Sequence, residues 1–137
     1  MATNKLDLRP PELVVLFDKG KTFSPTYYYL DKDNGVIDLT GYTARSQARI
    51  DDVLQTGWDI TTENGGITLV IGDAELEDGT IVQDAHGLQL LVDAVVTQDT
   101  LWNEANFDIE IIEPGGHVLP FLKGTLEAFE EQTKPEV

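Results

Sequence analysis

Turn-forming residues recur along the chain at short intervals, and they constrain the fold more than any other feature. Most of these turns join glycine to residues such as Asp, Asn or Pro, which accept the backbone conformations of tight turns. The predicted turns are Asp33-Asn34-Gly35, Thr40-Gly41, Glu63-Asn64-Gly65-Gly66, Asp78-Gly79, His86-Gly87 and Pro114-Gly115-Gly116. The segments between them alternate apolar and polar residues or are rich in β-forming residues. This pattern predicts an all-β fold: an antiparallel β-sandwich, Ig-like or jelly-roll-like, with at most one short helical turn.

Residues 42–50 decide between a strand and a helix. A helix there would have no apolar stripe at helical spacing. A strand would place Tyr42, Ala44, Ser46, Ala48 and Ile50 on one face, and Thr43, Arg45, Gln47 and Arg49 on the other. We predict a strand whose small face packs closely under another sheet. Arg45 and Arg49 then lie on the outer face, among neighbouring acids or at a contact with another chain.

The other β segments are predicted to pair with their neighbours in sequence. Three hairpins follow from the turns between them: 26–30 with 36–39, 58–61 with 67–71, and 107–112 with 118–129. Pro120 and Gly124 predict an irregular or edge ladder in the last of these, because proline cannot donate a hydrogen bond to a neighbouring strand.

Three further segments have weaker patterns. Residues 13–17 form a short apolar run after two prolines. Residues 72–87 are acidic and predict a long loop or an edge hairpin around Ile81-Val82. Residues 96–103 predict a helical turn with Thr97 as its N-cap.

The chain has 137 residues, which predicts a single domain over 1–137. We expect an extended N-terminal segment at about 1–12 and a frayed polar tail at about 131–137. No apolar run approaches the roughly 20 residues that span a bilayer. The first residues lack the apolar core of a signal peptide, and the chain contains no cysteine. These features predict synthesis in a reducing cytoplasm without insertion into a membrane.

The charge is strongly acidic and unevenly distributed along the chain. The net charge is −16, with seven basic and nine acidic residues in 1–60 but only Lys123 and Lys134 against sixteen acids in 61–137. Such a surface repels phosphate groups and anionic lipids, so we expect neither nucleic acid nor membrane as a partner. The acidic half is interpreted as a solubilising surface, with docking on a basic partner or binding of Ca²⁺ as alternatives.

Residue patterns typical of catalysis or of cofactor binding are missing from the sequence. His86 and His117 lie in predicted turns without a second ligand at metal-binding spacing, and neither serine lies in a G-x-S-x-G motif. No phosphate-binding glycine motif occurs. We therefore expect no enzyme, no cofactor and no metal site. Binding of Ca²⁺ by the acids of 73–84 is kept as an alternative.

Aromatic residues could in principle form a platform for sugar stacking. The candidates are Tyr27, Tyr28, Tyr29, Trp58 and Trp102. Consecutive tyrosines in a strand point to opposite faces, so Tyr27 and Tyr29 share one face at most. Packing of one face in the core is the favoured interpretation.

Several stretches together resemble a family of small bacteriophage structural proteins. They are GKTFSPTYYYLDKDNGVIDLTGYTARSQARI at 20–50, ENGGITL at 63–69 and FDIEIIEPGGHVLPFLKGTLEAFEEQT at 107–133. Their succession is similar to the N-terminal domain of phage baseplate upper proteins, a β-sandwich that mediates attachment within the tail. The resemblance extends from about residue 20 to 133 and is most specific at 37–49. The segment 72–87 is longer and more acidic than in that family.

The resemblance implies a non-enzymatic, multi-copy component of the virion, in the tail, the baseplate or the tail-fibre attachment region, made in the host bacterial cytoplasm. Its partners would be other virion proteins and copies of itself, with the less acidic half of the chain docking. We expect Tyr27, Tyr29, Arg45 and Arg49 to form the protein interface. The alternative for these residues is ion pairs within the chain and tyrosines in its core. A capsid decoration or cement protein and a carbohydrate-binding adsorption module are the alternative functions.

Overall fold

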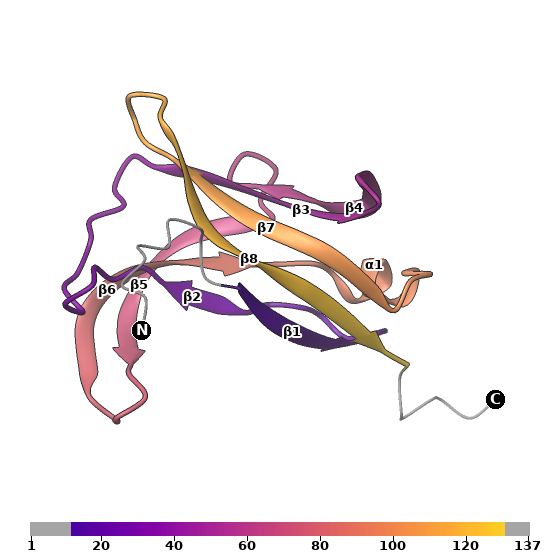
Figure 1. Ribbon diagram of the computed structural model, residues 1–137, viewed down its shortest axis with the longest axis horizontal. Coiled ribbons are helices and arrows are strands. Elements are labelled where there is room, and N and C mark those ends of the chain that lie inside the picture. The colour runs from indigo at the N-terminus through magenta and orange to yellow at the C-terminus, as the bar shows by residue number, and fades with distance from the viewer. Residues whose placement is uncertain (1–11, 131–137) are drawn as a thin grey trace, which may run out of the picture.

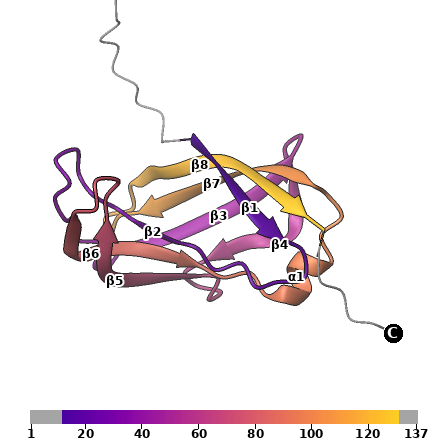
Figure 2. The same ribbon diagram turned by 90° about the horizontal axis from the view of Figure 1, so that it is seen from below.

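The computed structural model describes residues 12–130, which form two packed β-sheets and one short helix (Figure 1). The elements are β1 Glu12–Asp18, β2 Thr26–Tyr28, β3 Thr43–Ile50, β4 Val53–Thr61, β5 Ile67–Glu75, β6 Ile81–Leu90, α1 Ala94–Gln98, β7 Glu104–Ile112 and β8 Val118–Phe129. One sheet has the strand order β1-β8-β7-β3-β4 and the other β2-β6-β5. Figure 2 shows them as two layers with α1 at one end. The predicted all-β sandwich with one short helical turn is confirmed.

The pairing departs from a purely antiparallel arrangement at one place. β1 runs parallel to β8, whereas every other neighbouring pair is antiparallel. The apolar run 13–17 is thus a strand at the sheet edge. The expected extended segment and frayed tail fall on residues 1–11 and 131–137, outside the described residues, and Glu12 already belongs to β1. No helix within residues 12–130 is long and apolar enough to cross a membrane.

β3 confirms the prediction for residues 42–50. Ala44, Ser46 and Ala48 are buried, whereas Arg45 and Arg49 are exposed. Ser46 is satisfied within the sheet, because its hydroxyl donates to the backbone carbonyl of Asp108 at 2.7 Å. Small side chains allow the strand to lie centrally, between β7 and β4.

The core fills the space between the sheets and ends in an aromatic cluster. Alternate residues of β7 point inward, and Ile109 and Ile111 are fully buried. Phe17 packs against Trp58 with ring centroids 5.0 Å apart and against Trp102 at 5.7 Å. Burial of these rings fixes β1 and β4 to the same core.

Two of the three predicted hairpins are wrong. Residues 26–30 and 36–39 share only the bridge between Leu30 and Val36, and β2 pairs with β6 instead. Asp31 closes the predicted turn, since its Oδ1 accepts from the backbone N–H of Gly35 at 2.7 Å. The chain then crosses to the other sheet, and Leu39 on this crossing is buried in the core at 1% exposure, a favourable apolar contact.

The second wrong hairpin lies around Asn64. β4 belongs to the five-stranded sheet and β5 to the three-stranded one. The side chain of Asn64 stabilises this crossing, with its Oδ1 accepting from the N–H groups of Thr61 and Gly66 at 2.9 Å each. The hairpin of β7 and β8 is confirmed, as is its irregular ladder, which shifts register beside Pro120.

His86-Gly87 is not a turn but part of β6. A Cβ on Gly87 would lie 2.5 Å from the carbonyl oxygen of Tyr27 and 2.9 Å from the ring of Tyr28, so glycine is needed here for close packing. For 72–87 the edge hairpin is confirmed, because β5 is an edge strand that pairs with β6 across the turn at Gly79.

The predicted helical turn begins two residues early, with Asp93 rather than Thr97 as N-cap. Thr97 is fully buried inside α1. Its hydroxyl donates to the carbonyl of Lys21 at 2.8 Å and accepts from the N–H of Gly20 at 3.1 Å. Thr97 therefore fastens α1 to the loop after β1, a long-range role that its local sequence did not indicate.

Candidate functional site

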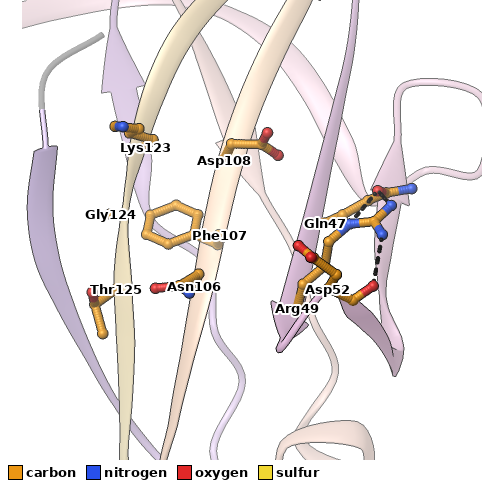
Figure 3. Close-up of a pocket in the computed structure, with 9 residues that line it drawn as sticks. All are labelled: Gln47, Arg49, Asp52, Asn106, Phe107, Asp108, Lys123, Gly124 and Thr125. Carbon is orange, nitrogen blue, oxygen red and sulfur yellow. Dashed lines mark hydrogen bonds between the residues drawn. The ribbon is translucent and has the colours of Figure 1, made fainter. Parts of the chain in front are cut away.

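A shallow depression of about 430 Å³ lies on the outer face of the five-stranded sheet (Figure 3). Its lining is mostly polar and comes from β3, β7, β8 and the turn after β3. The lining residues are Gln47, Arg49, Asp52, Asn106, Phe107, Asp108, Lys123, Gly124 and Thr125. The site is open to solvent, as expected for a surface that contacts another surface rather than enclosing a small substrate.

Strand register arranges the polar lining in two rows across three strands. Asp108 lies opposite Gln47 on one side and Lys123 on the other. Asn106 lies opposite Arg49 and Thr125 in the same way. Because side chains two residues apart in a strand share a face, both rows project from the same side of the sheet.

The Arg49 guanidinium is positioned by neighbours on its own strand and turn. Its Nε donates to Gln47 Oε1 at 3.1 Å and its Nη2 donates to the same oxygen. Its Nη1 donates to the carbonyl of Asp52 at 3.3 Å. Asp52 has a positive φ of 66°, a left-handed conformation that lets the turn direct this carbonyl toward the arginine. Figure 3 shows Arg49 held between the two residues.

Asp108 is the residue of the depression whose ionisation is most affected by its surroundings. Partial desolvation raises the pKa of its carboxyl, and the negative charge of Glu110 raises it further. The positive charges of Arg49 and Arg45 oppose both effects but do not cancel them. In Figure 3 the side chains of Asp108 and Lys123 point away from one another. An ionised Asp108 would therefore gain from a donor supplied by a partner.

The structure does not bring the four predicted interface residues together. Arg45 and Arg49 lie on the outer face of the five-stranded sheet, where Arg45 Nε and Glu110 Oε1 form an ion pair at 2.7 Å. Tyr27 and Tyr29 belong to the other layer and pack against the core. Tyr29 contacts Phe121 with ring centroids 5.1 Å apart, and burial raises the pKa of the Tyr27 hydroxyl.

Sequence reasoning identified only Arg49 of the lining residues. Asn106, Asp108 and Lys123 were missed, although Asn106 and Asp108 alternate with buried residues of β7. The alternation shows that such residues face outward. It does not show which of them become neighbours, because register between strands distant in sequence is set by tertiary packing.

The other candidate sites have less structural support. Within residues 12–130 no three His, Asp or Glu side chains are placed to hold a metal ion, so the acids of 73–84 do not form a calcium cage. Trp58 is buried, and Trp102 packs edge-on against it with centroids 5.4 Å apart. These rings are part of the core and offer no flat exposed platform for a sugar.

Together the fold and the depression define an all-β sandwich with an open polar face. Its amide, carboxylate, guanidinium and ammonium groups can recognise a polar or charged surface through hydrogen bonds and ion pairs. A scan of protein-family models finds no match to the chain, and a search of curated proteins finds none either.

Proposed function

We propose that the chain is a non-enzymatic structural protein of a bacteriophage particle, present in many copies in the tail, the baseplate or the tail-fibre attachment region. Its partners are other virion proteins and copies of itself. The protein is made in the host cytoplasm and incorporated into the virion during assembly.

One observation carries this proposal: the most specific stretch of the phage resemblance, 37–49, lies beside the stretch 107–133 in one sheet, whereas 63–69 leads into β5 of the other sheet. The stretch 37–49 leads into and forms most of β3, and the stretch 107–133 supplies β8 and most of β7. These three strands are neighbours in the order β8-β7-β3, and eight of the nine lining residues of the depression come from them. The stretches 37–49 and 107–133 thus contribute to one face suited to contact with another protein.

The character of this face supports assembly rather than catalysis. Arg45 and Arg49 are engaged with Glu110 and Gln47, so their positions are fixed before any partner arrives. Preorganised polar groups of both signs on an open sheet give specificity of docking. Tyr27 and Tyr29 are half-buried in the other layer, so we assign only the two arginines to this interface.

The decisive experiment is quantitative mass spectrometry of purified particles from the phage or prophage that encodes the chain. Assembly in the tail predicts a copy number per particle far below that of the major capsid protein, and loss of tails or fibres when the gene is deleted. A copy number close to that of the capsid protein, with intact tails in the deletion, would favour the capsid decoration alternative. Absence of the chain from purified particles would refute both.

A glycan array tests the remaining alternative function. A carbohydrate-binding adsorption module predicts saturable binding of the purified chain to defined glycans. The burial of Trp58 and the packing of Trp102 favour a negative result. Specific binding that is abolished by Asn106→Ala or Gln47→Ala would instead assign the depression to sugar recognition.

A further inference from the structure

Within residues 12–130 the two sheets have four edge strands, and three of these carry features that discourage pairing with another chain. β2 has only three residues. β5 shifts register between Gly72 and Ala74 and carries acids at Asp73 and Glu75. β4 contains Gly57, which has a positive φ of 85°, and its pairing with β3 shifts register. Short length, bulges and charges are the usual means by which proteins protect sheet edges.

Among the described strands, β1 is the edge without such protection. It has seven residues and keeps one register along its whole length, from Glu12 opposite Lys123 to Asp18 opposite Phe129. Between these ends the sequence LVVLF contains no glycine, proline or charge. Phe17 points into the core, whereas Val14 and Leu16 point outward with 57% and 59% of their surface exposed. No strand of residues 12–130 lies on the other side of β1.

The surface beside this edge combines apolar groups with acids, of which Asp18 forms an ion pair with Lys21 at 3.8 Å. On β8, Glu127 lies opposite Leu16, and Phe129 lies opposite Asp18 with 46% of its surface exposed. Glu127 also lies directly opposite Glu104 of β7. Neither glutamate has an ion-pair partner among residues 12–130, and like charges placed opposite one another in a sheet repel.

We propose that the free edge of β1 binds a β-strand of a partner protein that carries apolar side chains against Val14 and Leu16 and a Lys or Arg against Asp18. The partner strand binds the backbone groups on the side of β1 where no strand of residues 12–130 lies, and it extends the five-stranded sheet. Its basic side chain adds to the charge of Lys21 beside Asp18 and offsets the negative potential of Glu127 and Glu104. The inference rests on the proposed assembly role and specifies the surface that would perform it.

A second copy of the chain is a poorer fit for this edge. Each copy carries a net charge of −16, and the same acids would approach one another across a symmetric contact. A basic partner reverses the sign of this interaction. The electrostatic pattern therefore favours a different virion protein at this edge over self-association.

The test is an NMR titration of the full ¹⁵N-labelled chain with two short peptides. The first, Lys-Thr-Val-Thr-Val-Thr-Lys, presents valines flanked by lysines on one face in either strand direction. The second, Val-Thr-Lys-Thr-Lys-Thr-Val, has the same composition and charge but places the lysines against Val14 and Leu16. We expect the first peptide to shift the amides of 12–18 and 123–129, and to bind at least about fivefold more tightly than the second.

Matched variants locate the contact. Leu16→Thr shortens an exposed apolar side chain on β1, and Ile71→Thr does the same on the edge strand β5, where Ile71 is 63% exposed. Both positions are at the surface and both new residues favour strands, so the fold is retained. We expect Leu16→Thr to weaken binding of the first peptide about fivefold and Ile71→Thr to leave it unchanged.

Three results would overturn the inference. Equal affinity for the two peptides, or shifts on the acidic β5–β6 hairpin instead of β1, would reduce the binding to non-specific charge attraction. If millimolar peptide caused no chemical-shift change in β1, the proposed binding of a strand of this pattern would be refuted. If the amide chemical shifts of β1 changed with protein concentration in the absence of peptide, the edge would bind a second copy of the chain instead. Incorporation of the chain into particles is measured in a separate experiment. A negative peptide titration would therefore refute strand binding at β1 without refuting the proposed assembly role.

Discussion

Substitution of Gly124 by alanine should detach β1 from the sandwich. Gly124 lies on β8 opposite Leu13 of β1, where the two backbones approach so closely that an added Cβ would lie 1.9 Å from the Leu13 carbonyl oxygen. The Leu13 carbonyl carbon and nitrogen would lie at 2.9 and 3.0 Å. These atoms belong to the backbone, so no side-chain rotation can relieve the overlap. β1 must move away from β8.

The size of the effect is bounded by two considerations. Overpacking of this kind commonly costs about 1–3 kcal/mol. Complete detachment of β1 sets a ceiling, because it exposes the buried Phe17 and the half-buried Leu13 and Val15, together worth about 4–5 kcal/mol. We therefore expect Gly124→Ala to lower the free energy of unfolding by about 3 kcal/mol.

Urea denaturation followed by tryptophan fluorescence measures this loss. With a slope of about 2 kcal/mol per molar urea, the midpoint should fall by about 1.5 M. Amide exchange should accelerate first in 12–18. Gly115→Ala is the matched control, since Gly115 has no positive φ and a methyl group added there would meet nothing within 4 Å. If Gly124→Ala were as stable as Gly115→Ala, the close approach of β1 and β8 would be refuted.

Three further substitutions test the sheet by urea denaturation. Glu127→Gln should stabilise the protein by about 0.2–1 kcal/mol by removing repulsion from Glu104, and the gain should shrink in high salt; no gain at low salt would contradict the like-charge contact. Ser46→Ala should cost about 1 kcal/mol, since it removes the buried hydrogen bond to the Asp108 carbonyl, and an unchanged midpoint would contradict that bond. Asp108→Asn should stabilise the protein at neutral pH, because the raised pKa of Asp108 makes its ionised form less favourable in the folded state than in the unfolded state. That advantage should disappear as the pH falls through the raised pKa to below the ordinary aspartate value, and a gain that grows toward acid pH would contradict the sign of the shift.

Local pattern was sufficient to predict the fold class and the orientation of β3. The alternation of small and polar side chains in 42–50 specifies both the strand and its buried face, because one face must enter the core. The same reasoning correctly placed the turns at Gly35 and Gly65. It failed at the next step, where the chain crosses from one sheet to the other after these turns instead of folding back.

The failures share a physical cause in contacts between residues distant in sequence. Gly87 looks like a turn residue locally, but it is required in β6 by the ring of Tyr28. Thr97 looks like an N-cap, but its hydroxyl bonds to backbone atoms near residue 20. The polar depression is a third case, since its rows depend on the register of β3, β7 and β8.

Charge is distributed differently in space than along the sequence. The five-stranded sheet interleaves the two halves of the chain, so that Arg45 of the less acidic half pairs with Glu110 of the acidic half. The strands of the three-stranded sheet contain no Lys or Arg within their bounds, but they do contain Asp73, Glu75 and Asp84. The less acidic half of the sequence therefore does not form a docking face of its own.

Because of this charge distribution, the surfaces that attract a basic partner are not all able to bind it specifically. A basic partner is drawn toward both outer faces, because the long-range field follows the net charge of −16. The three-stranded face can hold such a partner only through exposed acids, and interactions of that kind are weak and screened by salt. β1 adds backbone groups that face no other strand of the described part of the chain, the apolar side chains of Val14 and Leu16, and acids that lie beside them in fixed register. Added salt should therefore weaken peptide binding at every acidic surface. At the edge of β1, and only there, the tighter binding of the first peptide over the second should persist.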